Sequence, residues 1–564
     1  MQFPEDQSPR DRESISIHAG PIRQWLDANI LELGRQIRLS YLPPLMVYLA
    51  AGISGLTGIV GTFFVKEYLG LSAEFLASLG FWAMLPWAMK MPMGHLVDLL
   101  WRHKGRLIYF GAGLVALSLL IMIGLLAKPA AMREIMSPES WYVLSVLLAP
   151  MGYVIQDTVA DAMTVEAVPR VDEEGNAIPD EQLKLAHTTM QTLGRVAIIG
   201  GTLLVAAVNV FMFSGVENMD IDQKKGIYLE IYRLALVIPA VSVAGVWLSA
   251  MVRNRDARRL AAQGFELDAI EKMQSAHVET PEVNWWILGG SLAFLAFSVV
   301  MGLADFKFSA EIVFAGSMGI VLFLMRQLTR DIAPDARLEL FGTAAVIFVF
   351  RAVPTSGAGS TWWMIDELGF DQQFLSKLSL LASALALLGM FVFRRFMAER
   401  SVIYVFGALT VAGALLYLPN IAMFYGFHHW TSALTHGLID ARAIALIDTA
   451  LESPLGQIAM IPMLTWIARS APPALKATYF AVMAAFTNLA LSLSQLGTKY
   501  LNQVFTVTRQ ITDGVTGAIK VPADYSQLGE LYISVTLLGL ILPLTTIYLV
   551  QRHAPRLARQ EARN

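Results

Sequence analysis

The sequence predicts an all-α polytopic membrane protein with about fourteen spans, arranged as six plus six helices with two extra central helices. The composition is 55% hydrophobic and 15% charged, with a mean hydropathy of +0.54, whereas soluble domains carry roughly 25% charged residues. Apolar stretches of about 20 residues recur, and one such helix crosses a hydrocarbon core of about 30 Å. An acidic motif also occurs twice, which indicates two related halves.

The distribution of positive charge predicts the orientation of the spans. These are expected at 43–65, 73–97, 106–127, 141–165, 188–213, 228–251, 284–304, 309–326, 339–362, 375–396, 401–419, 438–468, 475–497 and 529–551. Most Lys and Arg residues fall on one side of the membrane if both termini are cytoplasmic, as the positive-inside rule requires. We therefore expect an even number of spans in a bacterial inner membrane, with both termini in the cytoplasm.

The chain divides at its polar segments. The expected parts are a cytoplasmic N-terminal segment at 1–42, a six-helix half at 43–251, a cytoplasmic connector at 252–283, two inserted spans at 284–326, a second six-helix half at 339–551 and a cytoplasmic tail at 552–564. Residues 21–40 are typical of an amphipathic helix on the membrane surface. No signal-peptide pattern precedes the first span, so we expect that span to direct insertion. The absence of cysteine excludes disulfides and thiolate metal sites.

The repeated acidic motif lies in the fourth span of each half. Asp157 to Asp161 reads DTVAD and Asp448 to Glu452 reads DTALE. Parallel repeats about an axis along the membrane normal are typical of major facilitator transporters, whose site lies between the halves near the midplane. The two acidic faces are therefore expected at equivalent places on either side of a central cavity.

Acids four residues apart share one face of a helix. A charged side chain at the centre of a span costs about 2.5 to 3.5 kcal/mol when it faces lipid, so this face should look into protein or water. Possible counter-charges are Lys90, Arg195, Arg351 and Arg442, all within predicted spans. Two interpretations stay open: substrate or proton handling, and ion pairs that hold the halves together.

Several collinear segments resemble the folate-biopterin transporter family of the major facilitator superfamily. In the first half they are Phe63 to Ser72 (FFVKEYLGLS), Pro86 and Trp87 with Lys90, Pro92, Gly94 and Asp98, then Gly105, Arg106 and Tyr109, and Asp157 to Glu166. In the second half they are Phe348 to Phe374 and Ile447 to Asn488. Three features depart from the family pattern: Lys476 replaces an acid, Val97 replaces a serine before Asp98, and two extra central spans are present.

The resemblance implies uptake of a folate, a pterin or a related anionic metabolite. Such a ligand needs basic groups for its carboxylates, polar groups for its ring edge and aromatic rings for stacking. The candidate substrate-binding residues are Lys90, Gln156, Arg195, Arg351 and Asp448, and the candidate aromatic residues are Trp82, Trp87, Trp362 and Trp363. The candidate residues for proton coupling or gating are Asp98, Arg106, Asp157, Asp161, Glu166 and Glu452. Trp362 and Trp363 are also typical of an interfacial aromatic belt.

Arg351 and Lys90 are the most informative of these residues. Arg351 lies near the middle of its span, too deep to reach the membrane surface, and Pro354, Gly357 and Gly359 follow it and favour local unwinding. Lys90 lies about two-thirds along its span. It could reach the cytoplasmic face and pair with Asp98 or Asp161.

The sequence favours a secondary active transporter. Its acid pairs favour coupling to protons, because a carboxylate can bind and release the coupled proton. No GxxxxGK[ST] loop for ATP and no recognisable arrangement of catalytic residues is present, so we expect neither ATP drive nor an enzyme. His428, His429 and His436 are expected in a solvated outer loop, and no metal or cofactor is predicted. The expected partners are a small molecule, protons and the lipid bilayer, without nucleic acid, and the chain is expected to be a monomer. Two alternatives remain: a major facilitator transporter of an unrelated substrate, and a membrane scaffold or assembly factor.

Overall fold

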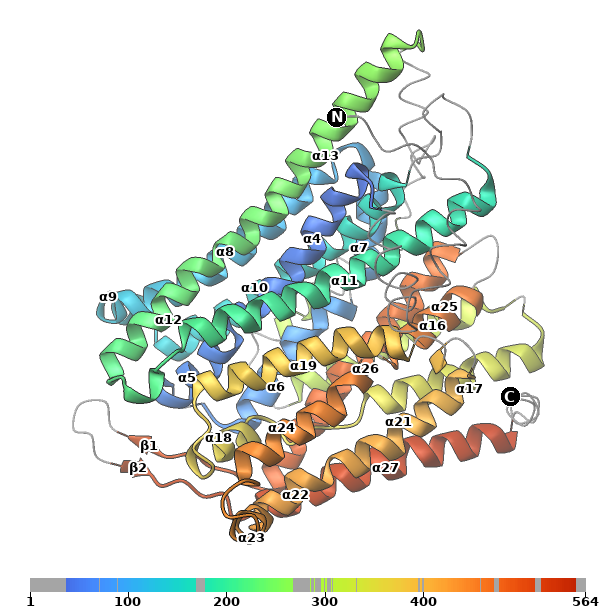
Figure 1. Cartoon of the computed structure of the whole chain (residues 1–564). Helices are drawn as coiled ribbons and strands as arrows, with labels where there is room; N and C mark the ends of the chain where they lie inside the picture. Colours follow the sequence, from blue (N-terminus) through green and yellow to red (C-terminus); the bar gives the residue numbers. More distant parts are fainter. Residues whose placement is uncertain are drawn as a thin grey trace, which may run out of the picture.

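The chain forms two bundles of long helices and one small β-hairpin (Figure 1). The computed structural model describes residues 37–69, 71–88, 90–168, 178–266, 308–330, 332–393, 396–397, 400–456, 458–470, 476–512 and 519–553, with isolated positions between 285 and 306. The predicted surface helix at 21–40, the predicted span 284–304, most of the connector and the tail beyond 553 lie largely or wholly outside the described residues.

The N-terminal half consists of α4 to α13. Its elements are α4 (Leu42–Ile53), η3 (Ser54–Thr57), α5 (Gly58–Tyr68), α6 (Ala73–Ala88), α7 (Lys90–Leu99), α8 (Gly105–Ala127), α9 (Pro129–Ile135), α10 (Pro138–Ala167), α11 (Asp180–Met212), α12 (Ile221–Ala235) and α13 (Val237–Ala262), with short 3-10 turns at Leu39–Tyr41, Trp101–His103 and Val216–Asn218. Helix α16 (Ser309–Leu328) lies between the halves in sequence.

The C-terminal half consists of α17 to α27. Its elements are α17 (Pro334–Arg351), α18 (Ala358–Asp366), α19 (Gln372–Val392), α21 (Val402–Leu416), α22 (Leu418–Phe424), α23 (Phe427–Leu434), α24 (Ala441–Glu452), η6 (Ser453–Leu455), α25 (Met460–Ser470), α26 (Lys476–Val504) and α27 (Leu528–His553). Strands β1 (Ile511–Thr512) and β2 (Ile519–Val521) pair antiparallel between α26 and α27. This hairpin is a small departure from the predicted all-α fold.

Ten helical segments of the described residues are long and apolar enough to cross a membrane, so the protein is a multi-pass membrane protein. Helices α6 with α7, α17 with α18, and α26 coincide with three further predicted spans. The count of fourteen stays a prediction, because most of residues 284–304 lie outside the described part. The segment 420–437, predicted as a loop, is largely helical, since α22 and α23 occupy it.

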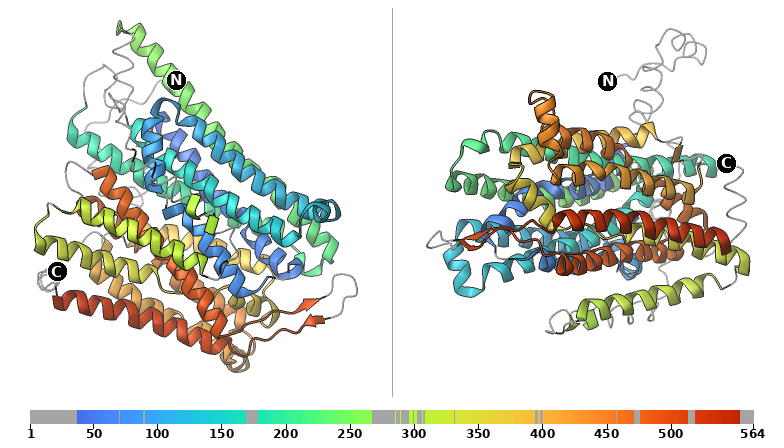
Figure 2. Two further views of the ribbon diagram at one scale, coloured as in Figure 1. Left: turned by 180° about the vertical axis from the view of Figure 1, so that it is seen from behind. Right: turned by 90° about the horizontal axis from the view of Figure 1, so that it is seen from below.

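The two halves lie side by side, with α13 and α27 on opposite outer faces (Figures 1 and 2). Helix α6 packs along α26, and α11 packs along α19. Helices α6 and α26 come close together at Gly80, where an added Cβ would lie 2.6 Å from the side chain of Gln495. Helix α16 contacts both α26 and α6, and Glu311 on it accepts hydrogen bonds from Lys499 (3.0 Å) and Tyr500 (2.5 Å). The inserted helix therefore packs across the line where the halves meet.

The loops between helices gather at two ends of the molecule. We call one the hairpin end, because it carries β1, β2, α9 and α23 (Figure 1). At this end a single buried apolar cluster includes residues of both halves, among them Phe63 and Phe64 of α5 and Trp362 and Trp363 of α18. Elsewhere in the described residues, each half has apolar clusters of its own, and one smaller cluster joins Phe81 of α6, Val313 of α16 and Leu496 of α26. The halves are therefore joined most completely at the hairpin end.

The burial of Trp362 and Trp363 corrects one prediction. Their exposed fractions are 2% and 5%, and Trp363 packs against Phe424 and Tyr532. An interfacial belt requires aromatic side chains that face lipid headgroups. Both tryptophans are instead part of the protein core, because α18 lies between the two halves.

The predicted unwinding after Arg351 is confirmed. Helix α17 ends there, residues 352–357 are not helical, and α18 begins at Ala358 after Gly357, whose φ of 74° is easily reached only without a side chain. The freed backbone groups are bonded by α26. Ser494 donates to the Val353 carbonyl (2.7 Å), and the Thr355 amide donates to Thr498 (2.9 Å).

These partners follow a helical repeat, because Ser494, Thr498 and Asn502 are four residues apart on α26. The amide of Asn502 reaches the Ser356 carbonyl at 3.4 Å. The break is therefore built into the packing of α26 and does not leave its backbone to a ligand.

A second break interrupts the predicted span 438–468. Helix α24 ends at Glu452, a 3-10 turn follows at Ser453–Leu455, and α25 begins at Met460. Pro454 lacks the N–H that would continue the helix. Its backbone packs against Gly389 of α19, where a Cβ would lie 2.2 Å from the Pro454 carbonyl oxygen. The second acidic motif therefore lies directly before a helix break.

Candidate functional site

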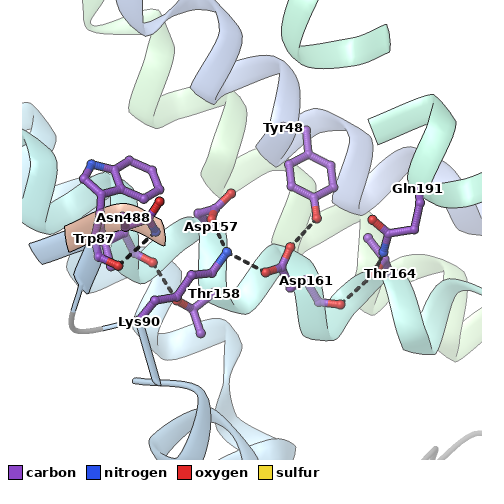
Figure 3. A network of polar contacts seen from close by, with 10 residues as sticks. Tyr48, Trp87, Lys90, Asp157, Thr158, Asp161, Thr164, Gln191 and Asn488 are labelled. Carbon is purple, nitrogen blue, oxygen red and sulfur yellow. Dashed lines mark hydrogen bonds and ion pairs between the residues drawn. The ribbon is translucent and has the colours of Figure 1, made fainter. Parts of the chain in front are cut away.

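Lys90 forms the centre of a half-buried polar cluster in the N-terminal half (Figure 3). Its ammonium group lies 2.5 Å from Asp157 Oδ2 and 2.7 Å from Asp161 Oδ2. The exposed fractions of the side chains are 22% for Lys90, 17% for Asp157 and 47% for Asp161. The predicted pairing of Lys90 with Asp161 is confirmed, and Asp157 is a second partner.

The acids are placed by α10 and the cation by the first turn of α7. The four-residue spacing of Asp157 and Asp161 puts both carboxylates on one face, as expected from the motif. Tyr48 of α4 donates to Asp161 at 2.6 Å, and Arg195 of α11 adds a positive charge near Asp157 and Tyr48. Four helices of the N-terminal half thus contribute to one cluster, and its two negative charges are matched.

This cluster lies beside the contact between α6 and α26. Asn488 of α26 donates to the carbonyl of Trp87, three residues before Lys90, at 3.2 Å (Figure 3). The preceding residue, Thr487, accepts through its carbonyl from Arg351 Nε at 3.0 Å. Arg351 of the C-terminal half and Lys90 of the N-terminal half therefore both lie near residues 487 and 488 of α26. A site between the halves requires such residues from both of them.

Arg351 is the C-terminal residue of α17, at the edge of the helix break. Besides Thr487, its guanidinium contacts Met463 of α25 through Nη1 at 3.7 Å. No carboxylate pairs with it within the described part of the chain, and Nη2 has no protein partner there. A partly buried guanidinium with free N–H groups can receive a carboxylate or a phosphate.

The second acid pair has a different environment from the first. Asp448 is 8% exposed, and its Oδ2 accepts from Asn420 of α22 at 2.9 Å. Its Oδ1 is buried and has no hydrogen-bond partner in the described residues. Glu452, one turn later, is exposed. The contacts described here do not join the two acid pairs, so the prediction that they face each other stays a prediction.

Other predicted residues take part in packing or lie at helix ends. Gln156 is 4% exposed in the interface of α10 with α8, where its amide donates to the Gly152 carbonyl at 3.3 Å. Glu166 pairs with Lys104, whose ammonium also lies 4.1 Å from the centre of the Trp101 ring. Burial lowers the pKa of Lys104. Arg106 is exposed in the first turn of α8, and Asp98 is in α7, with its side chain outside the description.

Further predicted residues lie at the hairpin end. Arg442, predicted within a span, is in the first turn of α24, where its side chain is exposed and pairs with Asp371 at 3.3 Å. His428 and His429 lie on α23, with ring centres 4.0 Å apart. His428 hydrogen-bonds the Met423 carbonyl at 2.9 Å, and its pKa is lowered, first by burial and then by His429.

The sequence reasoning missed an ion pair between the halves. Lys66 of α5 lies 2.5 Å from Asp366 of α18, and Tyr525 donates to the other oxygen of Asp366 at 2.5 Å. A repeat could have revealed it: Phe63 to Phe75 (FFVKEYLGLSAEF) aligns with Trp362 to Phe374 (WWMIDELGFDQQF). The two segments end the first helix of each half, and they meet at the hairpin end.

The repeat carries matching contacts in both halves. Glu67 aligns with Asp366, and it accepts from Tyr228 of α12 at 3.4 Å, as Asp366 accepts from Tyr525 just before α27. Tyr228 also accepts from Gln372 of α19 at 2.7 Å, which joins the halves a second time. Each of these two aligned acids is thus bound by a tyrosine of its own half, Glu67 by Tyr228 of α12 and Asp366 by Tyr525 just before α27.

Arg509 adds a third connection, from the segment before β1. It is 3% exposed, donates to the Val65 carbonyl of α5, and its guanidinium lies 5.2 Å from the centre of the Trp362 ring. Burial lowers its pKa to about 10, so the group stays charged near neutral pH. We call Lys66, Asp366, Tyr525 and Arg509 the hairpin-end latch.

The latch is expected to hold the halves together in this conformation. Because the chain has no cysteine, a Lys66→Cys/Asp366→Cys pair can be cross-linked selectively with a short bifunctional thiol reagent. We expect cross-linking to stop uptake and cleavage of the linker to restore it. The matched control is Asp371→Cys/Arg442→Cys, an ion pair within one half at the same end, whose cross-linking should leave uptake within about twofold. Normal uptake by the cross-linked latch pair would contradict a role in opening.

Comparison with known proteins is informative at this point. The model of the BT1 family matches residues 318–562, which include Arg351, Asp448 and the C-terminal side of the latch. A curated relative, the folate-biopterin transporter of Synechocystis sp., is 22% identical over 478 residues, covering 84% of this chain and 76% of that protein. These two matches show that the chain is similar to the folate-biopterin transporter family, the first over its C-terminal part and the second over most of its length. The family resemblance predicted from the sequence motifs is thereby confirmed.

Solved structures show the fold of this chain. A peptide transporter POT in complex with sulfate is 13% identical, with a TM-score of 0.55, covering 91% of this chain and 94% of that one. A POT family transporter in complex with a thioalcohol-conjugated peptide is 12% identical, with a TM-score of 0.55 and coverage of 91% and 96%. The fold is therefore that of major facilitator transporters, as predicted.

Proposed function

We propose that this protein is a proton-coupled importer of a folate-like or pterin-like organic anion. In this proposal it lies in a bacterial inner membrane as a monomer, with both termini cytoplasmic, so that the hairpin end faces outward. The distribution of Lys and Arg supports the orientation. The name of the Synechocystis relative supports the class of substrate.

The observation that carries the proposal is Arg351. It lies at a helix break between α17 and α18, with one carbonyl and one thioether as partners and no carboxylate in the described residues. A charge within a membrane span normally has a compensating partner or a function. We propose that the carboxylate of the substrate is this partner and that it binds the free N–H groups of the guanidinium.

Two alternatives are weighed against the same residue. A transporter of an unrelated anion would also use Arg351, so the choice of substrate depends on the family and on competition assays. A scaffold or assembly factor has no need for a cation without a carboxylate partner. The latch, by contrast, is compatible with either a transporter or a scaffold, and it does not discriminate.

Uptake into membrane vesicles tests the proposal. Labelled folate, labelled pterin and a panel of other organic anions are offered with and without an imposed proton gradient. We expect folate or pterin to accumulate, and to accumulate faster when the side of the hairpin end is acidic. Accumulation of another anion alone would favour the unrelated-substrate alternative. No accumulation of any compound above vesicles without the protein would exclude transport of this panel and favour a scaffold.

The contrast between the two acid pairs favours Asp448 as the group that carries the coupled proton. Lys90 contacts both carboxylates of the first pair, whereas Asp448 has one amide partner, one unbonded buried oxygen and no cation among its described contacts. A buried oxygen that lacks a donor can take up a proton without losing an ion pair. We propose that Asp448 is the group that carries the coupled proton, with Glu452 beside it on α24.

Asp448→Asn should separate coupling from binding. The amide is isosteric and can still bond Asn420, so the fold should persist. We expect the stimulation of uptake by an acid outside to fall at least about fivefold, while counterflow exchange of substrate, which needs no net proton movement, continues. The matched control is Asp371→Asn, at a helix cap of the hairpin end. An unchanged response of Asp448→Asn to the gradient would contradict the assignment.

A further inference from the structure

A half-open cavity of about 440 Å³ lies in the N-terminal half, apart from the Lys90 cluster and Arg351. Helices α5, α6, α8, α10 and α12 contribute to its wall, together with the 3-10 turn η3, and α18 of the other half covers it. Cavities that hold small molecules usually measure about 300 to 1,000 Å³. Its volume is therefore sufficient for part of a ligand.

The lining of this cavity contains no charged side chain. Four aromatic residues line it, namely Tyr142, Tyr153, Tyr232 and Trp362, and they alternate with Ser, Thr and small apolar residues. An isolated carboxylate or ammonium would lose its hydration here without gaining a counter-charge, which is strongly unfavourable. The cavity therefore suits an uncharged group with a flat apolar face and a polar edge.

Two of the tyrosines have hydroxyl groups without a protein partner. Tyr232 is 4% exposed, and neither it nor Tyr142 makes a side-chain hydrogen bond in the described part of the chain. By contrast, Ser118 and Ser145 satisfy each other at 2.9 Å, and Ser54 bonds the Ala51 carbonyl at 2.7 Å. Buried hydroxyls are normally paired. The two free hydroxyls therefore mark where a ligand edge can bond.

Trp362 connects the cavity to the hairpin-end latch. It lines the cavity, and it also lies beneath the guanidinium of Arg509, which holds the Trp362 indole in place. Only 2% of its surface is exposed, so its ring closes one end of the cavity and leaves little of its face open to a ligand. A ligand here would be in contact with the residue on which the latch closes.

We propose that this cavity binds the uncharged, planar heteroaromatic ring of the substrate, while its anionic part binds elsewhere, at Arg351. This inference rests on the proposed function and adds the division of the ligand between two chemically distinct subsites. Tyr142 and Tyr232 bond the polar edge of the ring, and Trp362 closes the end of the subsite. Closure of the latch over Trp362 then depends on occupation of the ring subsite.

Gly61→Leu tests the subsite by filling it. Gly61 lines the cavity, and an added Cβ there has only the Tyr232 hydroxyl nearby, at 3.9 Å, so the backbone has room. The matched control is Gly113→Leu on α8. A Cβ at Gly113 meets nothing within 4 Å, and Gly113 does not line the cavity. Tyr142→Phe/Tyr232→Phe removes only the two hydroxyls and serves as the variant least able to disturb folding.

Binding to the purified protein is measured with free pterin, whose fluorescence reports the complex. We expect Gly61→Leu to weaken pterin binding at least about tenfold and the double Phe variant about five- to tenfold, the loss of roughly one to two hydrogen bonds. Gly113→Leu should bind as the unmodified protein does. Binding of p-aminobenzoylglutamate, the anionic half of folate, should stay within about twofold in all three variants.

The outcomes separate this inference from the proposed function. Absence of pterin binding to the unmodified protein, or equal weakening of both halves of folate by Gly61→Leu, would overturn the ring subsite, even if folate is transported. Normal pterin binding with cavity-specific losses, but no uptake into vesicles, would instead overturn the proposed transport and retain the subsite.

Discussion

Replacing Arg351 with alanine is expected to reduce uptake of an anionic substrate by about 10- to 100-fold. A hydrogen bond to a charged group contributes roughly 1.5 to 3 kcal/mol, which corresponds to this range at one binding site. The fold should persist, because the substitution leaves one carbonyl, that of Thr487, without its donor and no acid without its cation. The measurement is initial uptake into vesicles at several substrate concentrations, with the amount of folded protein determined in parallel.

Two controls define the meaning of that result. Arg351→Lys keeps the charge but loses the planar fork, so we expect a partial recovery of uptake for a substrate that is bound by two N–H groups. Arg233→Ala removes an exposed arginine at α12 and should change uptake by less than about twofold. Equal loss for anionic folate and for an uncharged pterin in Arg351→Ala would show that Arg351 does not select the anion.

The fold was predictable because each span is encoded locally. Apolar stretches of membrane length, separated by basic or turn-forming segments, depend only on residues that are neighbours in sequence. The described helices coincide with the predicted spans, and the proline and glycines after Arg351 correctly indicated a break. The break after Glu452 was missed, although Pro454 and Gly456 provide a similar signal.

The residues of the site could be predicted from the sequence better than the contacts that they make with one another. Charges inside spans are few, so Lys90, Asp157, Asp161, Arg351 and Asp448 could be chosen from the sequence. Their partners depend on which helices become neighbours. Nothing local indicates that Asn420 bonds Asp448, or that Lys66 reaches Asp366, 300 residues later in the chain. The same limit explains Arg442, whose place at a helix start depends on where α24 begins.

Lys90 should have the largest effect on stability. Lys90→Met would leave Asp157 and Asp161 facing each other on α10 without their shared cation. Removal of one partner from a buried ion pair costs about 3 to 5 kcal/mol. We expect a markedly lower thermal unfolding temperature in detergent and little folded protein in the membrane. Lys104→Met, which breaks the pair with Glu166, provides a comparison with a single acid.

Neutralising the acids as well should restore the protein. In Lys90→Met/Asp157→Asn/Asp161→Asn no carboxylate without a cation remains in the cluster and Arg195 is its one remaining charge, so the unfolding temperature should recover most of the loss. If Asp448 carries the proton, this triple variant should also respond to an imposed proton gradient, because its C-terminal acid is intact. A stable triple variant that takes up substrate without any response to the gradient would show that the Lys90 cluster, and not Asp448, carries the coupled proton. A triple variant as unstable as Lys90→Met would show that the ammonium stabilises the fold through its hydrogen bonds and packing, beyond neutralising the two acids.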